Sequence, residues 1–135
     1  MAEALVAYHS TLVAGAVLAV LIMVQVLVAD LAGMKAKHVP GMPVTDGHAS
    51  FHFRAVRALG NTNETLPLFL LLAGLALMLG ANAQWTNALA WVYVAARAGH
   101  MALYYARLGL ARSIAFGFSL GAQFALMVLV LAAAF

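Results

Sequence analysis

The chain has 135 residues, of which 66% are hydrophobic and only 8% are charged, and its mean hydropathy is +1.00. A soluble domain of this size cannot hide so much apolar surface, because small domains keep a large share of their residues at the surface. We therefore expect one domain whose solvent is lipid. The chain has no cysteine, which excludes disulfides and thiolate metal sites, and its seven lysines and arginines are too few and too scattered for nucleic-acid binding.

Four apolar segments are each long enough to cross a membrane, since a helix needs about 20 residues to span a hydrocarbon core of roughly 30 Å. Two of the connections, "GANAQ" and "LGLA", are short and imply antiparallel neighbours, whereas prolines and glycines interrupt the longer first connection. The predicted fold class is all-α, an integral-membrane four-helix bundle that occupies residues 1–135 as one domain. Its predicted spans are residues 5–31, 50–81, 85–107 and 112–135.

Positive charge is concentrated on two of the three connections. Lys35 and Lys37 lie in the first connection, Arg107 and Arg112 flank the third, and the second has no lysine or arginine. Because basic connections stay in the cytoplasm, we expect a multi-pass protein with this end in the cytoplasm and both termini on the other side.

Polar residues form one stripe on the second segment and another on the third. The spacing of three or four residues puts each stripe on one face of its helix. The first stripe is Arg54, Arg57, Asn61 and Glu64, and the second is Tyr93, Arg97, His100, Tyr104 and Arg107.

The two stripes are expected to face each other in an antiparallel pair. Matching their depths from the basic end brings Asn61 level with His100 and Glu64 level with Arg97, so that each ion of the latter pair reduces the desolvation cost of the other. Such a pair could simply hold two helices together. The excess of positive charge nevertheless favours an anionic ligand, with Glu64 left to receive an ammonium group.

The stretch "FRAVRALGNTNETLPLFL" (residues 53–70) resembles the signature of the MAPEG family, the membrane-associated proteins of eicosanoid and glutathione metabolism. Arg57, Asn61, Glu64 and Pro67 match the signature in place. The stretches "RAGHMALYY" and "ARSIAF" resemble the stripe of the family's third helix and the Arg-Ser opening of its fourth. The resemblance extends over nearly the whole chain.

This resemblance implies a homotrimer with three sites between adjacent subunits, open towards the cytoplasm. It implies glutathione as the co-substrate, with Glu64 on its amino group and Arg112, beside Ser113, stabilising its thiolate. Arg107 competes with Arg112 for that role. The second substrate would be an apolar electrophile or a lipid hydroperoxide delivered from membrane lipid, and no metal is expected. The predicted glutathione-binding residues are Arg54, Arg57, Asn61, Glu64, Arg97, His100, Tyr104 and Arg107.

Two other functions are compatible with the sequence. One is a non-catalytic lipid-binding or scaffolding trimer of the same fold. The other is a small proton-coupled exporter, which a guanidinium at the depth of Glu64 would disfavour because it would keep the carboxylate ionised. A metal site in the first loop is not expected, because His38 and His48 have only Asp46 nearby.

Overall fold

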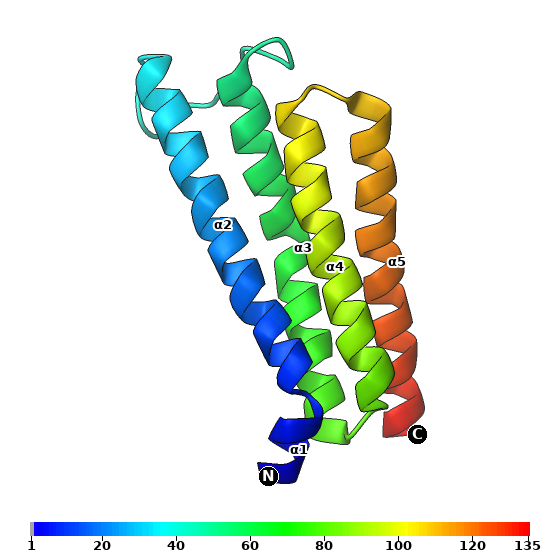
Figure 1. Ribbon diagram of the computed structural model, residues 1–135. Coiled ribbons are helices and arrows are strands. Elements are labelled where there is room, and N and C mark those ends of the chain that lie inside the picture. The colour runs from blue at the N-terminus through cyan, green and yellow to red at the C-terminus, as the bar shows by residue number, and fades with distance from the viewer. Residues whose placement is uncertain (1) are drawn as a thin grey trace.

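The computed structural model describes residues 2–135, and over that range the chain consists of helices and the loops between them. The all-α prediction is therefore confirmed for the described residues. A short helix at the beginning is followed by four long ones that run side by side (Figure 1). The helices are α1 (Ala2–Ala7), α2 (His9–Lys35), α3 (Phe51–Leu79), α4 (Ala83–Tyr105) and α5 (Gly109–Ala134).

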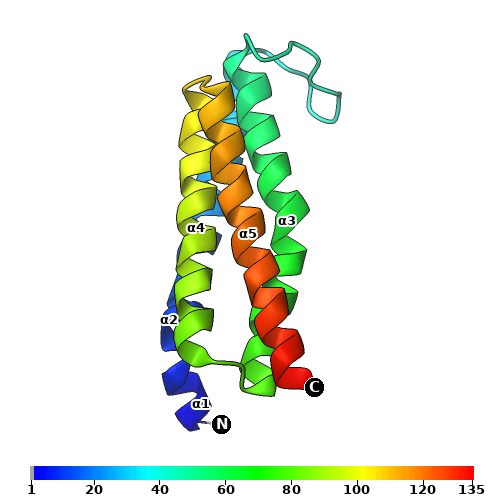
Figure 2. The same cartoon turned by 90° about the vertical axis from the view of Figure 1, so that its right-hand side faces the viewer.

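The long helices α3 and α4 form the middle of the bundle, and each packs against both α2 and α5. Figure 2 shows α5 in front of the α3–α4 pair, with α2 behind it. Both ends of the chain and the α3–α4 connection lie at one end of the bundle, while the α2–α3 and α4–α5 connections lie at the other (Figure 1). Lys35, Lys37, Arg54, Arg107 and Arg112 lie in or beside the second group of connections, and we call this end the basic end.

The starts of α2 and α5 differ from the predicted spans, and neither start has a side-chain cap. A hydrogen bond from the hydroxyl of Tyr8 to the carbonyl of Ala81 lies at the break between α1 and α2, so the first long helix begins at His9 and extends to Lys35. The helix α5 begins at Gly109, earlier than predicted, and Arg112 therefore lies in its first turn. Distant contacts of this kind leave no periodic signal in the sequence.

Caps explain the boundaries that the sequence predicted well. The hydroxyl of Ser50 accepts a hydrogen bond from the amide of Phe53 (3.3 Å) at the start of α3. The side-chain oxygen of Asn82 does the same for the amide of Trp85 (3.1 Å) at the start of α4. Serine and asparagine favour these positions because they satisfy free backbone amides of the first turn.

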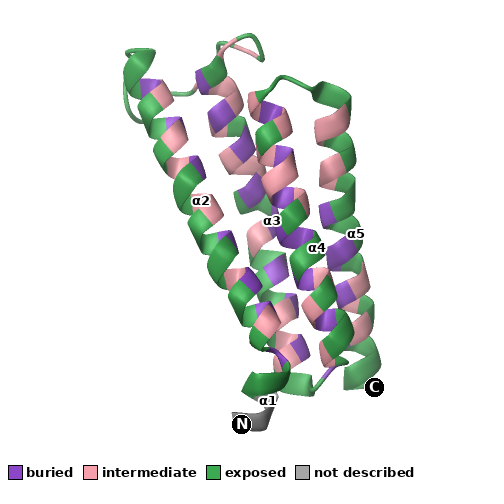
Figure 3. Cartoon of the chain, in the orientation of Figure 1, coloured by how far each residue is buried: buried purple, intermediate pink, exposed green. Residues whose placement is uncertain are grey.

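Three of the described helices, α2, α3 and α5, are long and apolar enough to cross a membrane. Large apolar side chains point outwards along their length, and Figure 3 shows exposed residues covering the outer faces of the bundle. The helix α4 has the length of a span, but its polar stripe lowers its hydropathy, so a fourth crossing remains a prediction.

An apolar core fills the half of the bundle that lies nearer the termini. The ring of Phe69 stacks on that of Tyr93, with centroids 4.2 Å apart, and Leu18 and Leu126 close the core from α2 and α5. The small side chains of Ala76 and Ala90, both fully buried, allow the helices to approach closely.

Replacing Gly80 by alanine should destabilise the bundle by about 1–2 kcal/mol, because Gly80 ends α3 in the left-handed region (φ 68°), where a Cβ atom is strained. Thermal unfolding in detergent, followed by circular dichroism, would measure the change. Gly74→Ala is the matched control, since Gly74 is helical and an added Cβ meets nothing within 4 Å. Equal unfolding temperatures for the two variants would contradict the prediction.

Candidate functional site

A buried arginine joins three helices at the centre of the polar region. The side chain of Arg97 on α4 is fully buried. Its Nη2 donates to Oδ1 of Asn61 (2.8 Å) and to Oγ1 of Thr62 (3.0 Å) on α3, and its Nη1 donates to Oγ of Ser119 (3.4 Å) on α5. A buried guanidinium is costly unless its donors are satisfied, and these three oxygens offset part of that cost.

Within one chain Arg97 bonds directly to Asn61 rather than to Glu64, although the charge of Glu64 still acts on the guanidinium of Arg97. Arg97 lies level with Asn61, and Glu64 is exposed. The reason is the register of the two helices, which is fixed by a hydrogen bond between the hydroxyls of Thr65 and Tyr93 (2.9 Å). Asn61 therefore lies level with Arg97 rather than with His100, about three residues or nearly one helical turn from the predicted register. The guanidinium of Arg97 thus lies within electrostatic range of the Glu64 carboxylate, as the argument against an exporter assumed.

The second polar stripe points into the bundle, except at its end. Tyr93, Arg97, His100 and Tyr104 are all buried. Arg107 instead follows the end of α4 with a left-handed backbone (φ 63°) and is exposed. The structure thus separates Arg107 from the rest of its predicted stripe.

Three of the predicted site residues meet at the basic end. The guanidinium of Arg112 lies over the ring of Tyr104, 4.2 Å from its centroid, and the ring of His100 meets that of Tyr104 edge-on at 5.4 Å. Arginine stacked on an aromatic face is held in place while its charge stays available to an anion. Ser113 is exposed, and its hydroxyl donates to the carbonyl of Gly109 (3.1 Å) within the first turn of α5.

The residues of the first polar stripe lie in two different environments. Arg54 holds the first loop, because its Nη1 donates to the carbonyls of His48 (2.7 Å) and Ala49 (2.9 Å). Arg57 and Glu64 are exposed on the outer face of α3, with the half-buried Asn61 between them. One chain therefore does not bring these two charges to Arg112.

Several buried polar residues of this region were not predicted from the sequence. Thr62, Thr65 and Ser119 look ordinary in an apolar helix, because membrane helices often carry serine and threonine, whose hydroxyls bond to the backbone of their own helix. The amide Nε2 of Gln123 donates to the carbonyl of Thr65 (2.7 Å), two residues before Pro67 in α3. Gln123 and the fully buried Gln25 could have indicated buried polar contacts in the sequence, since side-chain amides are rare in the middle of a membrane helix.

The comparisons with known proteins place the chain in a family. The model of the MAPEG family matches residues 10–132, nearly the whole chain. The chain therefore belongs to the MAPEG family, as its resemblance indicated, and it is an integral membrane protein. The family is associated with glutathione and includes transferases and peroxidases, but some of its members are not enzymes. No curated protein matches the chain.

Replacing Thr62 by valine should destabilise the bundle by about 1–3 kcal/mol, because the buried guanidinium of Arg97 loses an acceptor while the shape of the side chain is kept. Unfolding by sodium dodecyl sulfate from mild detergent would measure the loss. Thr45→Val in the exposed first loop is the control and should have no effect. A Thr62→Val protein as stable as the control would show that this hydrogen bond contributes nothing.

Proposed function

We propose that the protein is an integral-membrane, glutathione-dependent transferase or peroxidase in which Arg112 stabilises the glutathione thiolate. The observation that carries the proposal is the placement of Arg112, which is half-buried in the first turn of α5 and held over Tyr104 beside His100. Family membership supplies glutathione as the expected thiol.

The chemistry required of Arg112 is modest. A free thiol has a pKa of about 8.5, so only a few per cent is ionised at neutral pH, and each unit by which the pKa falls needs about 1.36 kcal/mol of preferential stabilisation of the thiolate. A guanidinium suits this role because it remains charged. The amino end of α5 adds a favourable field, since free backbone amides at a helix start attract anions. Ser113 lies in the same turn and would contribute a hydrogen bond to the thiolate if its hydroxyl turned away from Gly109.

Glutathione recognition also needs Arg57 and Glu64, which lie on the outer face of α3. This face continues with Leu68 and Leu71, which are exposed as well. A carboxylate on an otherwise apolar membrane helix is costly in contact with lipid. A neighbouring subunit that covers this face would remove the cost and would bring its own Arg112 to the two charges, which supports the predicted homotrimer. In that arrangement Arg57 and Asn61 would hold a glutathione carboxylate, and Glu64 would hold the amino group.

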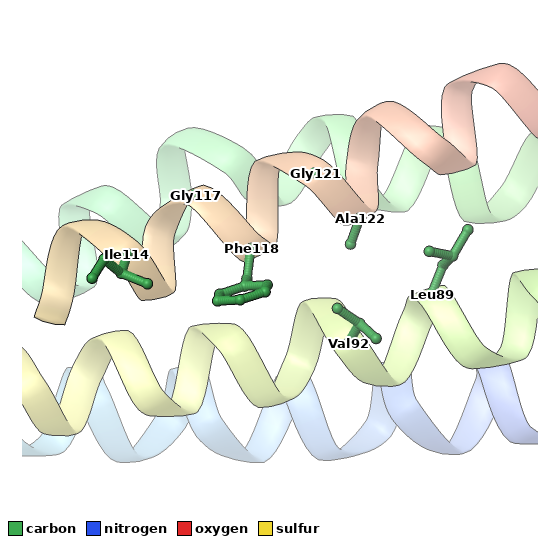
Figure 4. Close-up of a pocket in the computed structure, with 7 residues that line it drawn as sticks. All are labelled: Leu89, Val92, Ile114, Gly117, Phe118, Gly121 and Ala122. Carbon is green, nitrogen blue, oxygen red and sulfur yellow. The ribbon is translucent and has the colours of Figure 1, made fainter.

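The second substrate would approach along an apolar groove of about 430 Å³ between α4 and α5 (Figure 4). The groove is lined by Leu89 and Val92 on one side and by Ile114 and Phe118 on the other, and Ile114 directly follows Ser113. Gly117 and Gly121 add space, because a Cβ atom at either position would meet nothing within 4 Å. An apolar electrophile or hydroperoxide from the bilayer could thus reach the thiolate without passing through water.

Glutathione binding to the detergent-purified protein tests the proposal. We expect saturable binding with an ultraviolet difference signal from the thiolate. Arg112→Ala should bind glutathione but lose the thiolate signal. Glu64→Gln should keep the signal at saturation while its dissociation constant rises about tenfold, as expected when one charged contact worth about 1.4 kcal/mol is removed.

Arg107→Ala is the matched control, since Arg107 is the competing basic residue of the same connection. A thiolate signal lost in Arg107→Ala and kept in Arg112→Ala would assign the role to Arg107. Binding without any thiolate signal in the wild type would favour the non-catalytic, lipid-binding trimer. Absence of binding at millimolar glutathione would refute glutathione as the ligand.

Replacing Gly117 by leucine should obstruct the groove. We expect the KM for a long-chain hydroperoxide to rise about tenfold or more, the range typical of a mismatch in an apolar pocket, with an unchanged dissociation constant for glutathione. Steady-state peroxidase assays with a long-chain and a short-chain substrate would separate the two effects. Gly99→Leu on α4, outside the groove lining, serves as the control. Equal KM values for wild type and Gly117→Leu would rule out this approach route.

A further inference from the structure

A second cavity lies at the basic end, between the last turns of α2, the first turns of α3 and the loop that joins them. Its volume is about 560 Å³. The helix α3 lines it with His52, Val56 and Leu59, which lie about 120° around the helix axis from the face of Arg57 and Glu64. The cavity is thus separate from the proposed glutathione site.

Two imidazole rings meet in this cavity. His52 is 6% exposed, and its Nδ1 is buried without a hydrogen-bond partner. The ring of His38 packs against it with centroids 4.8 Å apart. Gly33 makes room for His52, because a Cβ atom there would lie 3.1 Å from Nε2 of the ring. A buried ring nitrogen without a partner is costly, and a cation bonded to it would offset that cost.

The ring of His38 is held by a hydrogen bond of the kind that metal-binding histidines usually make. The Nε2 of His38 lies 2.9 Å from the carbonyl oxygen of Met42. Because a carbonyl only accepts, Nε2 carries a proton, and in the neutral ring Nδ1 then keeps its lone pair. Histidine ligands commonly donate their other N–H to a backbone carbonyl in this way, which fixes the ring and raises its basicity.

Two thioethers complete the set of donors. Met34 on α2 and Met42 in the loop line the same cavity, and both side chains are mobile enough to turn inwards, being 74% and 62% exposed. Within the described residues, no three His, Asp or Glu side chains come close enough to hold a metal, so a zinc site of nitrogen and oxygen ligands is not built here. Imidazole and thioether together select copper(I).

We propose that the protein binds one copper(I) ion in this cavity, through His38, His52, Met34 and Met42. A metal bonded to one nitrogen of each imidazole at about 2.0 Å is compatible with rings as close as these. The carboxylate of Asp30, which also lines the cavity, adds a favourable potential for a cation. The sequence-based expectation of no metal considered His38 with His48, but the structure turns His48 towards Tyr104 and brings His52 to His38 instead.

Competition with the chromogenic copper(I) chelator bicinchoninate tests the proposal, using the full chain in detergent with ascorbate and without glutathione, which itself binds copper. We expect one copper(I) per chain. Met34→Leu/Met42→Leu should weaken binding at least about tenfold. Copper X-ray absorption should show sulfur scattering in the wild type and lose it in this variant. Because both methionines are exposed, the double substitution leaves the fold intact, which the unfolding temperature would verify.

Met23→Leu/Met78→Leu is the matched control, since these methionines are equally exposed but lie outside the cavity. It should bind copper as the wild type does, and so should Arg112→Ala, which affects only the proposed glutathione site. The proposal is overturned if the chelator removes all copper from the wild type. It is also overturned if Met34→Leu/Met42→Leu binds as tightly as the control, or if zinc(II) displaces copper(I) at equal concentration.

Discussion

The half of the bundle nearer the basic end depends on the hydrogen bonds of the Arg97 guanidinium. The guanidinium hydrogen-bonds to α3 and α5 from α4, and each of these helices must therefore turn a polar side chain inwards at the same depth. This requirement fixes the rotation of α3 about its axis. With Thr62 facing Arg97, Glu64, two residues further on and about 200° around the axis, must face outwards.

The outward position of Glu64 would separate the two halves of the proposed glutathione recognition. The charges that would bind the peptide lie on the surface of one chain, and Arg112, which would act on the sulfur, lies at the start of α5. On this helix Thr62 and Thr65 serve interior packing, Arg57 and Glu64 would serve the proposed ligand, and Asn61 lies between the two groups. In this arrangement the interior can be satisfied by hydroxyls and amides, which leaves the carboxylate free for a ligand.

Much of the fold was predictable because it follows from local rules. Apolar length and short connections predicted the long helices, and Ser50 and Asn82 mark helix starts by capping chemistry. The assembly of His100, Tyr104 and Arg112 was also predictable, since the short α4–α5 connection leaves them few other arrangements.

The partner of Arg97 could not be predicted from the sequence, because helix register depends on side-chain pairs such as Thr65 with Tyr93. Charge complementarity suggested Glu64, whereas neutral oxygens on two helices provide the contacts. The contact between the rings of His38 and His52 could not be predicted for a similar reason. One lies in the loop and the other on a helix, and the intervening residues have no regular period.

The composition of α4 has a consequence for how the chain enters the bilayer. Its buried arginine and polar stripe make it too polar to count among the apolar spans. The two terminal nitrogens of this arginine donate to oxygens of α3 and α5, while its Nε has no partner. The transfer of such a helix into the bilayer on its own lowers its free energy only slightly. Insertion of α4 should therefore be coupled to that of a neighbour, so that the α3–α4 hairpin, closed by Gly80–Asn82, is the unit that leaves the translocon.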